Sequence, residues 1–312
     1  MLHQPISDRL ASARTVLLSG AGGGYDLVGA VPLLVELRAL GKTVHLASLT
    51  FTDYLSLPLA SVSAALPNLA SVTGLAAEGQ RYCPEAWLAR WLGEQHGYRE
   101  PIWLLDKTGV GPLRSAYQHL ASALALDALV LVDGGIDVVL RGDETSIGTP
   151  GEDLASLAAV RGLPLPTKLI ACLGMGSELR DGICHEQFLA RVAQLTVAGG
   201  YLGAAALCPS VSSGGAYVTA ADYIVQNQVG LRQSHVQQVV RSAAQGGFGP
   251  TGPDTWLNPL LAFYWFFDAT VVADTHLFLS ALANTETALE VSAIIEGFRK
   301  TIPLKPQSHI PL

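Results

Sequence analysis

The sequence has 312 residues, and only 14% of them are charged, compared with about 25% in an average globular protein. A chain of this length buries a large core without disulfide bonds. The formal net charge of −7 argues against nucleic-acid binding, because no excess of basic residues exists to displace counterions from phosphates. The scarcity of charge predicts strands that are covered on both faces, and it favours a homo-oligomer.

Nothing in the sequence indicates secretion or a membrane partner. Residues 1–14 include Asp8, Arg9 and Arg14 and lack the apolar segment of a signal peptide. The longest apolar run, residues 260–267, is far shorter than the ~20 residues of a membrane span. The cysteines at 83, 172, 184 and 208 are widely spaced, which is typical of free thiols in a reducing compartment. We therefore expect a cytoplasmic protein.

The chain opens with a predicted strand at 15–19, a glycine-rich loop at 20–26 and a helix at 27–40 that ends before Gly41. Glycines let the main chain lie close to a bound molecule, and the N-terminus of the following helix attracts anions. From this unit we predict that five consecutive residues bind a ligand: Gly22, Gly23, Gly24, Tyr25 and Asp26.

Apolar and helical segments alternate along most of the remaining chain. Further strands are predicted at 43–49, near 69–72, and at 101–105, 128–132, 168–173, 201–207 and 270–273. Helices are predicted at 84–92, 113–124 and 185–197, and from starts near 150, 234, 258 and 285. The alternation predicts an α/β fold, a Rossmann-like doubly wound and mostly parallel sheet. We expect one domain over residues 1–312, with a more helical part from about residue 209.

Three local features add detail to this prediction. Thr149 and Glu152 are spaced as a capping box for the helix that begins at Pro150. The glycine and proline loop at 246–253 is a candidate cover for a site. The apolar segment 257–267 suggests an assembly surface.

Ligands of open α/β sheets bind outside the carboxyl ends of the strands, which narrows the search for a site. The first glycine loop matches neither common phosphate-binding motif, because Ala30 stands where a P-loop needs lysine and Tyr25 interrupts G-x-G-x-x-G. The predicted ends of other strands supply further ligand-binding candidates: Asp53, Gly174, Gly176 and Ser177.

The densest acidic group follows the strand at 128–132. Asp133 and Asp137 could bind Mg²⁺ or Ca²⁺ through oxygen, hold sugar hydroxyls, or act as general acid or base. A divalent metal ion is therefore the cofactor that the sequence suggests. Asp26 would either cap its helix or point into the cleft, where it would suit a hydroxyl, an amine or a metal ion. His276, spaced with Asp274 for one face of a strand, is a third catalytic candidate.

These motifs also carry a family resemblance. Residues 22–26 with 28–30, residues 133–137 and residues 148–150 resemble a bacterial and archaeal family catalogued only as a domain of unknown function. The resemblance implies a Rossmann-like fold and no particular activity. The glycine loop and its helix also look like the N-terminal half of nucleotide-sugar glycosyltransferases, in which this loop faces the acceptor or the donor phosphate.

Three hypotheses about function follow. The first is an enzyme that acts on a small nucleotide-like or sugar-like metabolite by group transfer, with Asp133 and Asp137 opposite the glycine loop. The second is a metal-dependent hydrolase of a glycosidic or phosphoester bond. The third is a non-catalytic ligand-binding or assembly protein.

Overall fold

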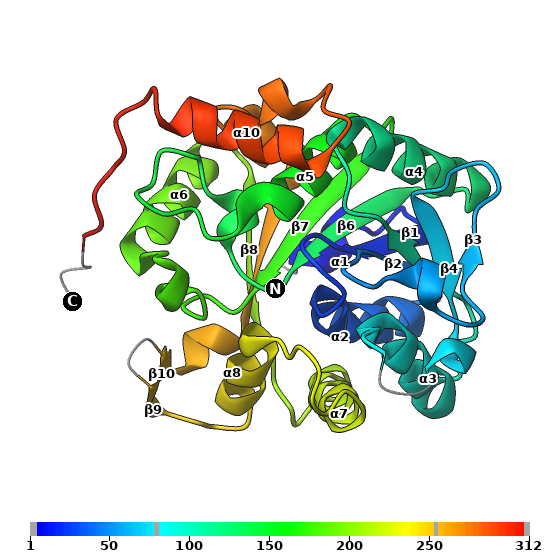
Figure 1. Ribbon diagram of the computed structural model, residues 1–312. Coiled ribbons are helices and arrows are strands. Elements are labelled where there is room, and N and C mark those ends of the chain that lie inside the picture. Colours follow the sequence, from blue (N-terminus) through cyan, green and yellow to red (C-terminus); the bar gives the residue numbers. More distant parts are fainter. Residues whose placement is uncertain (1–4, 78–80, 253–254, 309–312) are drawn as a thin grey trace.

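The computed structural model describes residues 5–77, 81–252 and 255–308. Its centre is a nine-stranded sheet with the order β3-β4-β5-β2-β1-β6-β7-β11-β8 (Figure 1). The strands of this sheet are β1 (Thr15–Gly20), β2 (Thr43–Leu49), β3 (Ser61–Val62), β4 (Leu69–Val72), β5 (Ile102–Leu105), β6 (Ala128–Asp133), β7 (Thr167–Leu173), β8 (Tyr201–Ala206) and β11 (Phe263–Asp268). The five neighbours from β5 to β7 are parallel, which confirms the predicted Rossmann-like α/β fold.

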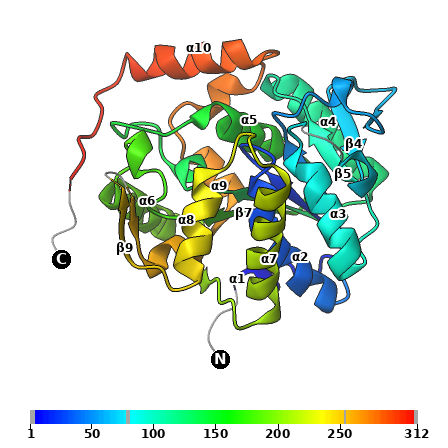
Figure 2. The same ribbon diagram turned by 60° about the horizontal axis from the view of Figure 1, so that its bottom comes forward.

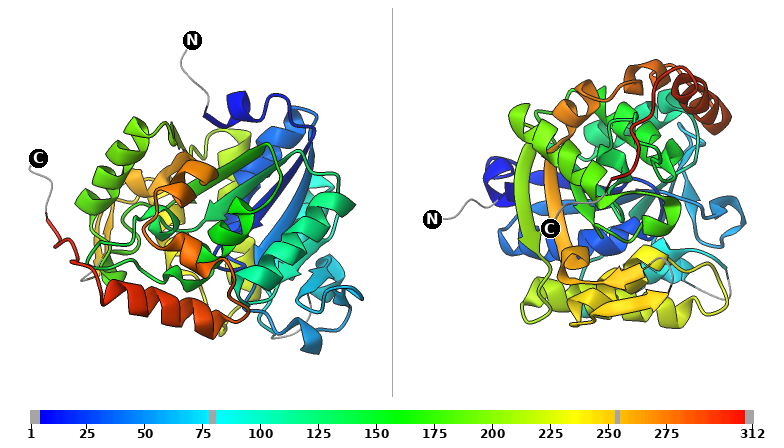
Figure 3. Two further views of the ribbon diagram at one scale, coloured as in Figure 1. Left: turned by 90° about the horizontal axis from the view of Figure 1, so that it is seen from above. Right: turned by 90° about the vertical axis from the view of Figure 1, so that its left-hand side faces the viewer.

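Helices cover both faces of this sheet. The helices are α1 (Pro5–Arg9), α2 (Asp26–Ala39), α3 (Pro84–His96), α4 (Val110–Ala123), α5 (Pro150–Arg161), α6 (His185–Val197), α7 (Ser212–Asn227), α8 (His235–Ala244), α9 (Ala269–Asp274) and α10 (Ala288–Arg299). On one face α7 packs against α2 and α3, with α8 beside it (Figure 2). On the other face α5 lies between α4 and α9, and α10 packs outside α5 (Figure 3).

Two apolar cores result, one on each side of the sheet. Val16 and Leu18 of β1 point into the core under α2, whereas Leu17 between them points into the core under α5. The six residues of β6 are all buried. Strands buried on both faces need continuous apolar sequence, which explains the low content of charge. Within the described residues, no helix is long and apolar enough to cross a membrane.

The second half of the sheet differs from the prediction in one strand. The apolar run at 260–267 forms most of β11, which is inserted antiparallel between β7 and β8. Phe266 and Phe267 are buried on opposite sides of it. Most of this apolar run therefore forms a strand inside the sheet of one chain. The apolar residues that suggested an assembly surface pack within the molecule.

Other local predictions need correction. Residues 270–273 are helical rather than a strand, because Asp268 accepts hydrogen bonds from the backbone N–H groups of Thr270 and Val271 and so caps α9. Thr149 precedes α5 but its side chain makes no capping hydrogen bond, and Glu152 instead pairs with Lys107.

Three further segments differ from their predicted form. Helix α7 was not predicted. The helix expected near residue 258 is a short 3-10 turn, Pro259–Ala262. In the glycine and proline loop, β9 (Gly249–Gly252) pairs with β10 (Thr255–Leu257), and residue 253 lies outside the described residues.

The inserted strand is tied to the first helix by one buried hydrogen bond. The Tyr264 hydroxyl donates to the Gly29 carbonyl at 2.7 Å, and Tyr264 is buried. We expect Tyr264→Phe to lower the free energy of unfolding by about 1 kcal/mol, because the buried carbonyl loses this donor. Chemical denaturation measures the change. Tyr201→Phe, at a partly exposed position of β8, is the control and should remain near wild type; equal losses in both variants would contradict this role of the bond.

Candidate functional site

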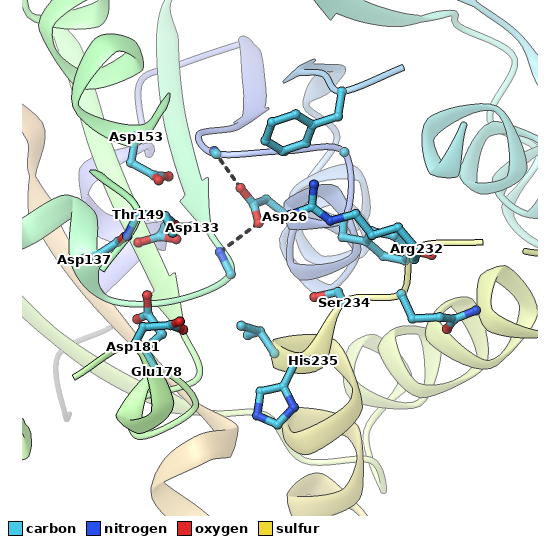
Figure 4. Close-up of a pocket in the computed structure, with 18 of the residues that line it drawn as sticks. Asp26, Asp133, Asp137, Thr149, Asp153, Glu178, Asp181, Arg232, Ser234 and His235 are labelled. Carbon is cyan, nitrogen blue, oxygen red and sulfur yellow. Dashed lines mark hydrogen bonds between the residues drawn. The ribbon is translucent and has the colours of Figure 1, made fainter. Parts of the chain in front are cut away.

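The described part of the chain contains a polar cleft at the carboxyl ends of the central strands (Figure 4). Its volume is about 220 Å³, which suits a small molecule. One wall is the loop after β1, residues 22–26, and another is the loop after β6, which contributes Asp133, Gly134 and Asp137. Because β1 and β6 are adjacent parallel strands, their carboxyl ends necessarily open at the same place. The structure thus brings together the two predicted acidic and glycine-rich segments.

Asp26 joins these two loops. One carboxylate oxygen accepts the Gly22 N–H at 2.7 Å, and the other accepts the Gly134 N–H at 3.2 Å. The Asp26 carboxylate therefore accepts a hydrogen bond from a main-chain N–H group in the loop that we predicted to bind a ligand. The glycine loop thus donates this N–H to the protein's own Asp26.

Six acidic side chains line the cleft. Asp181 is exposed and pairs with Arg180, and the other five are Asp26, Asp133, Asp137, Asp153 and Glu178. Burial raises the pKa of Asp26 and of Asp137 to about 7. Burial, followed by the charges of neighbouring carboxylates, raises the pKa of Asp133, Asp153 and Glu178 well above the usual range. These carboxyl groups are consequently costly to ionise together unless a cation joins them.

Glycines allow these carboxylates to lie against the main chain. A Cβ atom on Gly22 would be 2.5 Å from an Asp153 oxygen, and one on Gly134 would be 2.7 Å from an Asp26 oxygen. The same relation holds for three further pairs: Gly135 with Glu178, Gly148 with Asp137, and Gly24 with the buried Glu85 behind the loop. Real Cβ atoms do not approach oxygen so closely, so these positions accept no side chain without displacing a carboxylate.

The N-terminus of α5 holds two of the carboxylates. Asp137 accepts the Thr149 N–H at 3.0 Å, which fixes it just before the first residue of the helix. Asp153 lies in the first turn of α5, where the helix dipole favours negative charge. Glu178 reaches back from the loop after β7 and accepts the Ile136 N–H at 2.7 Å.

A cationic rim faces this acidic wall. Arg180 and Arg232 line the cleft and are exposed, and Arg180 pairs with Asp181 at 3.5 Å. Ser234 and the first two residues of α8, His235 and Val236, complete that side. The Arg232 guanidinium lies over the Phe51 ring at 5.0 Å, and the Tyr25 hydroxyl donates to the Arg232 carbonyl at 3.1 Å. Guanidinium groups beside a helix N-terminus favour an anionic group of a ligand.

Several predicted site residues do not line the cleft. Asp53 immediately precedes a short 3-10 turn, Tyr54–Ser56, and is exposed. Gly174 packs against Val236 and Val240 of α8, and Gly176 packs against His185. Ser177 is buried, with a hydroxyl that has no hydrogen-bond partner among the described residues.

His276 also lies away from the cleft. It packs against Phe278, whose N–H it accepts at 3.3 Å, and burial lowers the pKa of His276 to about 3. Asp274 pairs with Arg161 rather than with His276. The structure does not bring this pair together.

Sequence reasoning missed residues that the cleft does use, above all Asp153, Arg180 and Arg232. Asp153 follows the predicted start of a helix by three residues, and that position in the first turn was a usable signal. Glu178 closes the predicted loop after β7 but was not chosen from it. Arg232 lies between α7, which was not predicted, and α8, and no local signal marks it.

The raised carboxyl pKa values predict a pH dependence of stability. An ordinary Asp titrates near 3.8, so between pH 4 and pH 7 the folded protein holds protons that the unfolded chain has released. The free energy of unfolding should therefore fall as the pH rises through this window. The buffer contains a chelator, so that no metal ion competes with protons for the carboxylates. In Asp137→Asn one of these protons is absent, so the fall should be smaller. Denaturation curves at pH 5 and pH 8 measure this fall in each protein. An identical fall in wild type and in Asp137→Asn would contradict a buried, protonated Asp137.

Comparison with known proteins assigns a family. The model of the family described as "Protein of unknown function (DUF1152)" matches residues 95–299. The match includes Asp133, Asp137, Asp153 and the cationic rim, and it begins after the first glycine loop. No curated protein matches the sequence. Since the family model spans more than half of the chain, the protein belongs to the DUF1152 family, which confirms the predicted membership of a family of unknown function.

Proposed function

We propose that the protein is an enzyme that transfers a group to or from a small, nucleotide-like or sugar-like metabolite carrying an anionic group. The observation that carries this proposal is the pairing of an acidic wall with a cationic rim in one cleft, at the carboxyl ends of parallel strands. A ligand held by both sides must present unlike groups to them. Phosphorylated sugars and nucleotides have this character, with hydroxyls at one end and phosphate at the other.

The cationic rim would bind the anionic group. Arg232 and Arg180 supply guanidinium donors, and Ser234 with the first residues of α8 lines the same side of the cleft. The ring of Phe51 lies under Arg232 and narrows the positions that its guanidinium can take. The opposite wall, with Asp133 and Asp137, would accept hydrogen bonds from the hydroxyls of the metabolite.

Asp137 is the proposed general base. Its carboxylate lines the cleft while the Thr149 N–H fixes its orientation. In the transfer, the oxygen of an acceptor hydroxyl forms the new bond to phosphorus or to the anomeric carbon, and its proton passes to Asp137. The bond from the attacked atom to the leaving oxygen breaks, and that oxygen keeps the bonding electrons. In attack at the anomeric carbon it departs as part of a phosphate held by the rim, and in attack at phosphorus it departs as the ester oxygen of the donor while the phosphoryl group passes to the acceptor. A positioned carboxylate contributes roughly 10²- to 10⁴-fold to such a step.

A second candidate is hydrolysis of a phosphoester or glycosidic bond. In that reaction water takes the place of the acceptor hydroxyl and gives its proton to the same carboxylate. The close approach of the Asp26, Asp133 and Asp153 oxygens favours it, because such groups can hold a cation that activates water.

The first experiment identifies the ligand class. Native mass spectrometry of freshly purified protein shows a retained ligand, and thermal shift with a panel of sugar phosphates, nucleotides and neutral sugars shows which compounds bind. We expect stabilisation by phosphorylated members and none by neutral sugars. Arg232→Gln should weaken that binding roughly tenfold or more, because a charge-assisted hydrogen bond is lost. Arg99→Gln, an exposed arginine outside the cleft, should bind as wild type does.

A second experiment tests turnover. Phosphorus and proton NMR of the binding compounds, incubated with and without an acceptor alcohol, distinguishes transfer from hydrolysis by the product. Asp137→Asn should still bind the compound but lose at least about 100-fold in rate. Binding without any chemical change in wild type would contradict the enzyme and favour a ligand-binding protein. Unchanged turnover in Asp137→Asn would refute its assignment as the base.

A further inference from the structure

We infer that Asp26, Asp133 and Asp153 form a binding site for one divalent cation of the Mg²⁺, Mn²⁺ or Ca²⁺ class. One carboxylate oxygen from each residue lies within 4.8 Å of the other two. Oxygens bound to one such ion at about 2.1–2.5 Å can be at most about 4–5 Å apart, so the spacing fits a single ion. The three residues come from the loops after β1 and β6 and from the first turn of α5.

Asp153 supplies the observation that points to a ligand. The side chain is only 5% exposed, and its Oδ1 atom has no hydrogen-bond partner among the described residues. Figure 4 shows the carboxylate turned towards Asp26 and Asp133 inside the cleft. A buried, unpaired carboxylate oxygen facing two other carboxylates has a large desolvation cost, and a shared cation removes it.

Gly22 makes room for this arrangement. A side chain there would come within 2.5 Å of Asp153 Oδ1 and push the carboxylate out of the group. The absence of a Cβ at position 22 is thus a requirement of the cluster, independent of its charge.

Main-chain N–H groups orient the other two ligands. Asp26 is fixed by the Gly22 and Gly134 N–H groups, and Asp133 receives the Val138 N–H at 3.4 Å. Each carboxylate oxygen has two lone pairs, so these bonds leave positions for a cation. Groups that orient metal ligands in this way typically change metal affinity by about 10- to 100-fold when they are lost.

All three donors are carboxylate oxygens, which selects a hard cation. Asp137, which the sequence suggested as a metal ligand with Asp133, is outside this group of three and accepts the N–H of Thr149, just before α5. If the proposed function holds, the ion would also bridge the acidic wall to the anionic group of the metabolite. The binding of the ion itself does not depend on that function.

The test is direct binding of Mn²⁺ to the full chain, without any substrate. After dialysis against a chelator, titration with Mn²⁺ followed by electron paramagnetic resonance measures the free ion, and Mg²⁺ and Ca²⁺ are added as competitors. We expect one bound ion per chain and a rise in melting temperature with the ion, because only the folded state binds it. Asp153→Asn should weaken binding by about tenfold or more while leaving the melting temperature of the ion-free protein equal or higher.

Two further variants separate a built site from simple charge attraction. Asp137→Asn removes the same charge from the same cleft and should weaken binding much less than Asp153→Asn. Gly22→Ala keeps every charge and should weaken binding strongly. The inference is overturned if wild type binds none of the three ions at millimolar concentration, or if Asp137→Asn and Asp153→Asn weaken binding equally. Because no turnover is measured, failure here leaves the proposed enzymatic function to its own test.

Discussion

The contact of carboxylates with glycine main chain is the constraint on which this cleft depends. Six carboxyl groups line one polar cleft, and for five of them burial together with mutual repulsion opposes ionisation. The loops offset part of that cost by donating N–H groups to Asp26, Asp137 and Glu178. Such close approach is open only where no Cβ intervenes, so glycine is required at several loop positions. Loop sequence and acidic cluster are therefore one structural feature.

This constraint also explains why the first glycine loop resembles phosphate-binding loops without matching them. A loop after β1 that opens onto the N-terminus of α2 has free N–H groups and a favourable dipole, as phosphate loops do. Here Asp26, the first residue of α2, turns its carboxylate back into that space and accepts the Gly22 N–H. The Gly22 N–H, which a phosphate loop would donate to its ligand, is therefore used by a side chain of the protein itself.

Features fixed by local sequence were predictable, and features fixed by distant partners were not. The bounds of β2 and α6 agree with prediction because glycines mark them: Gly41 comes shortly before β2 and Gly199 shortly after α6, and both have positive φ. The insertion of β11 between β7 and β8 depends on pairings across about 90 residues, as in Phe266 with Ala171. Asp133 and Asp137 were found from the rule that ligands bind at strand ends. Asp153 escaped that rule because it reaches the cleft from a helix.

The opposition of two unlike walls raises the question of how the acidic side is neutralised when an anionic ligand approaches. Protonation could remove the charge, and the raised pKa values of Asp26 and Asp137 allow it near neutral pH. It would not give the buried Asp153 Oδ1 atom a partner, since a proton satisfies one oxygen and three carboxylates converge there. A cation satisfies all three at once and leaves the wall attractive to an anionic group. Of the two ways to neutralise the cluster, the cation is the one that also gives the buried Asp153 Oδ1 atom a partner.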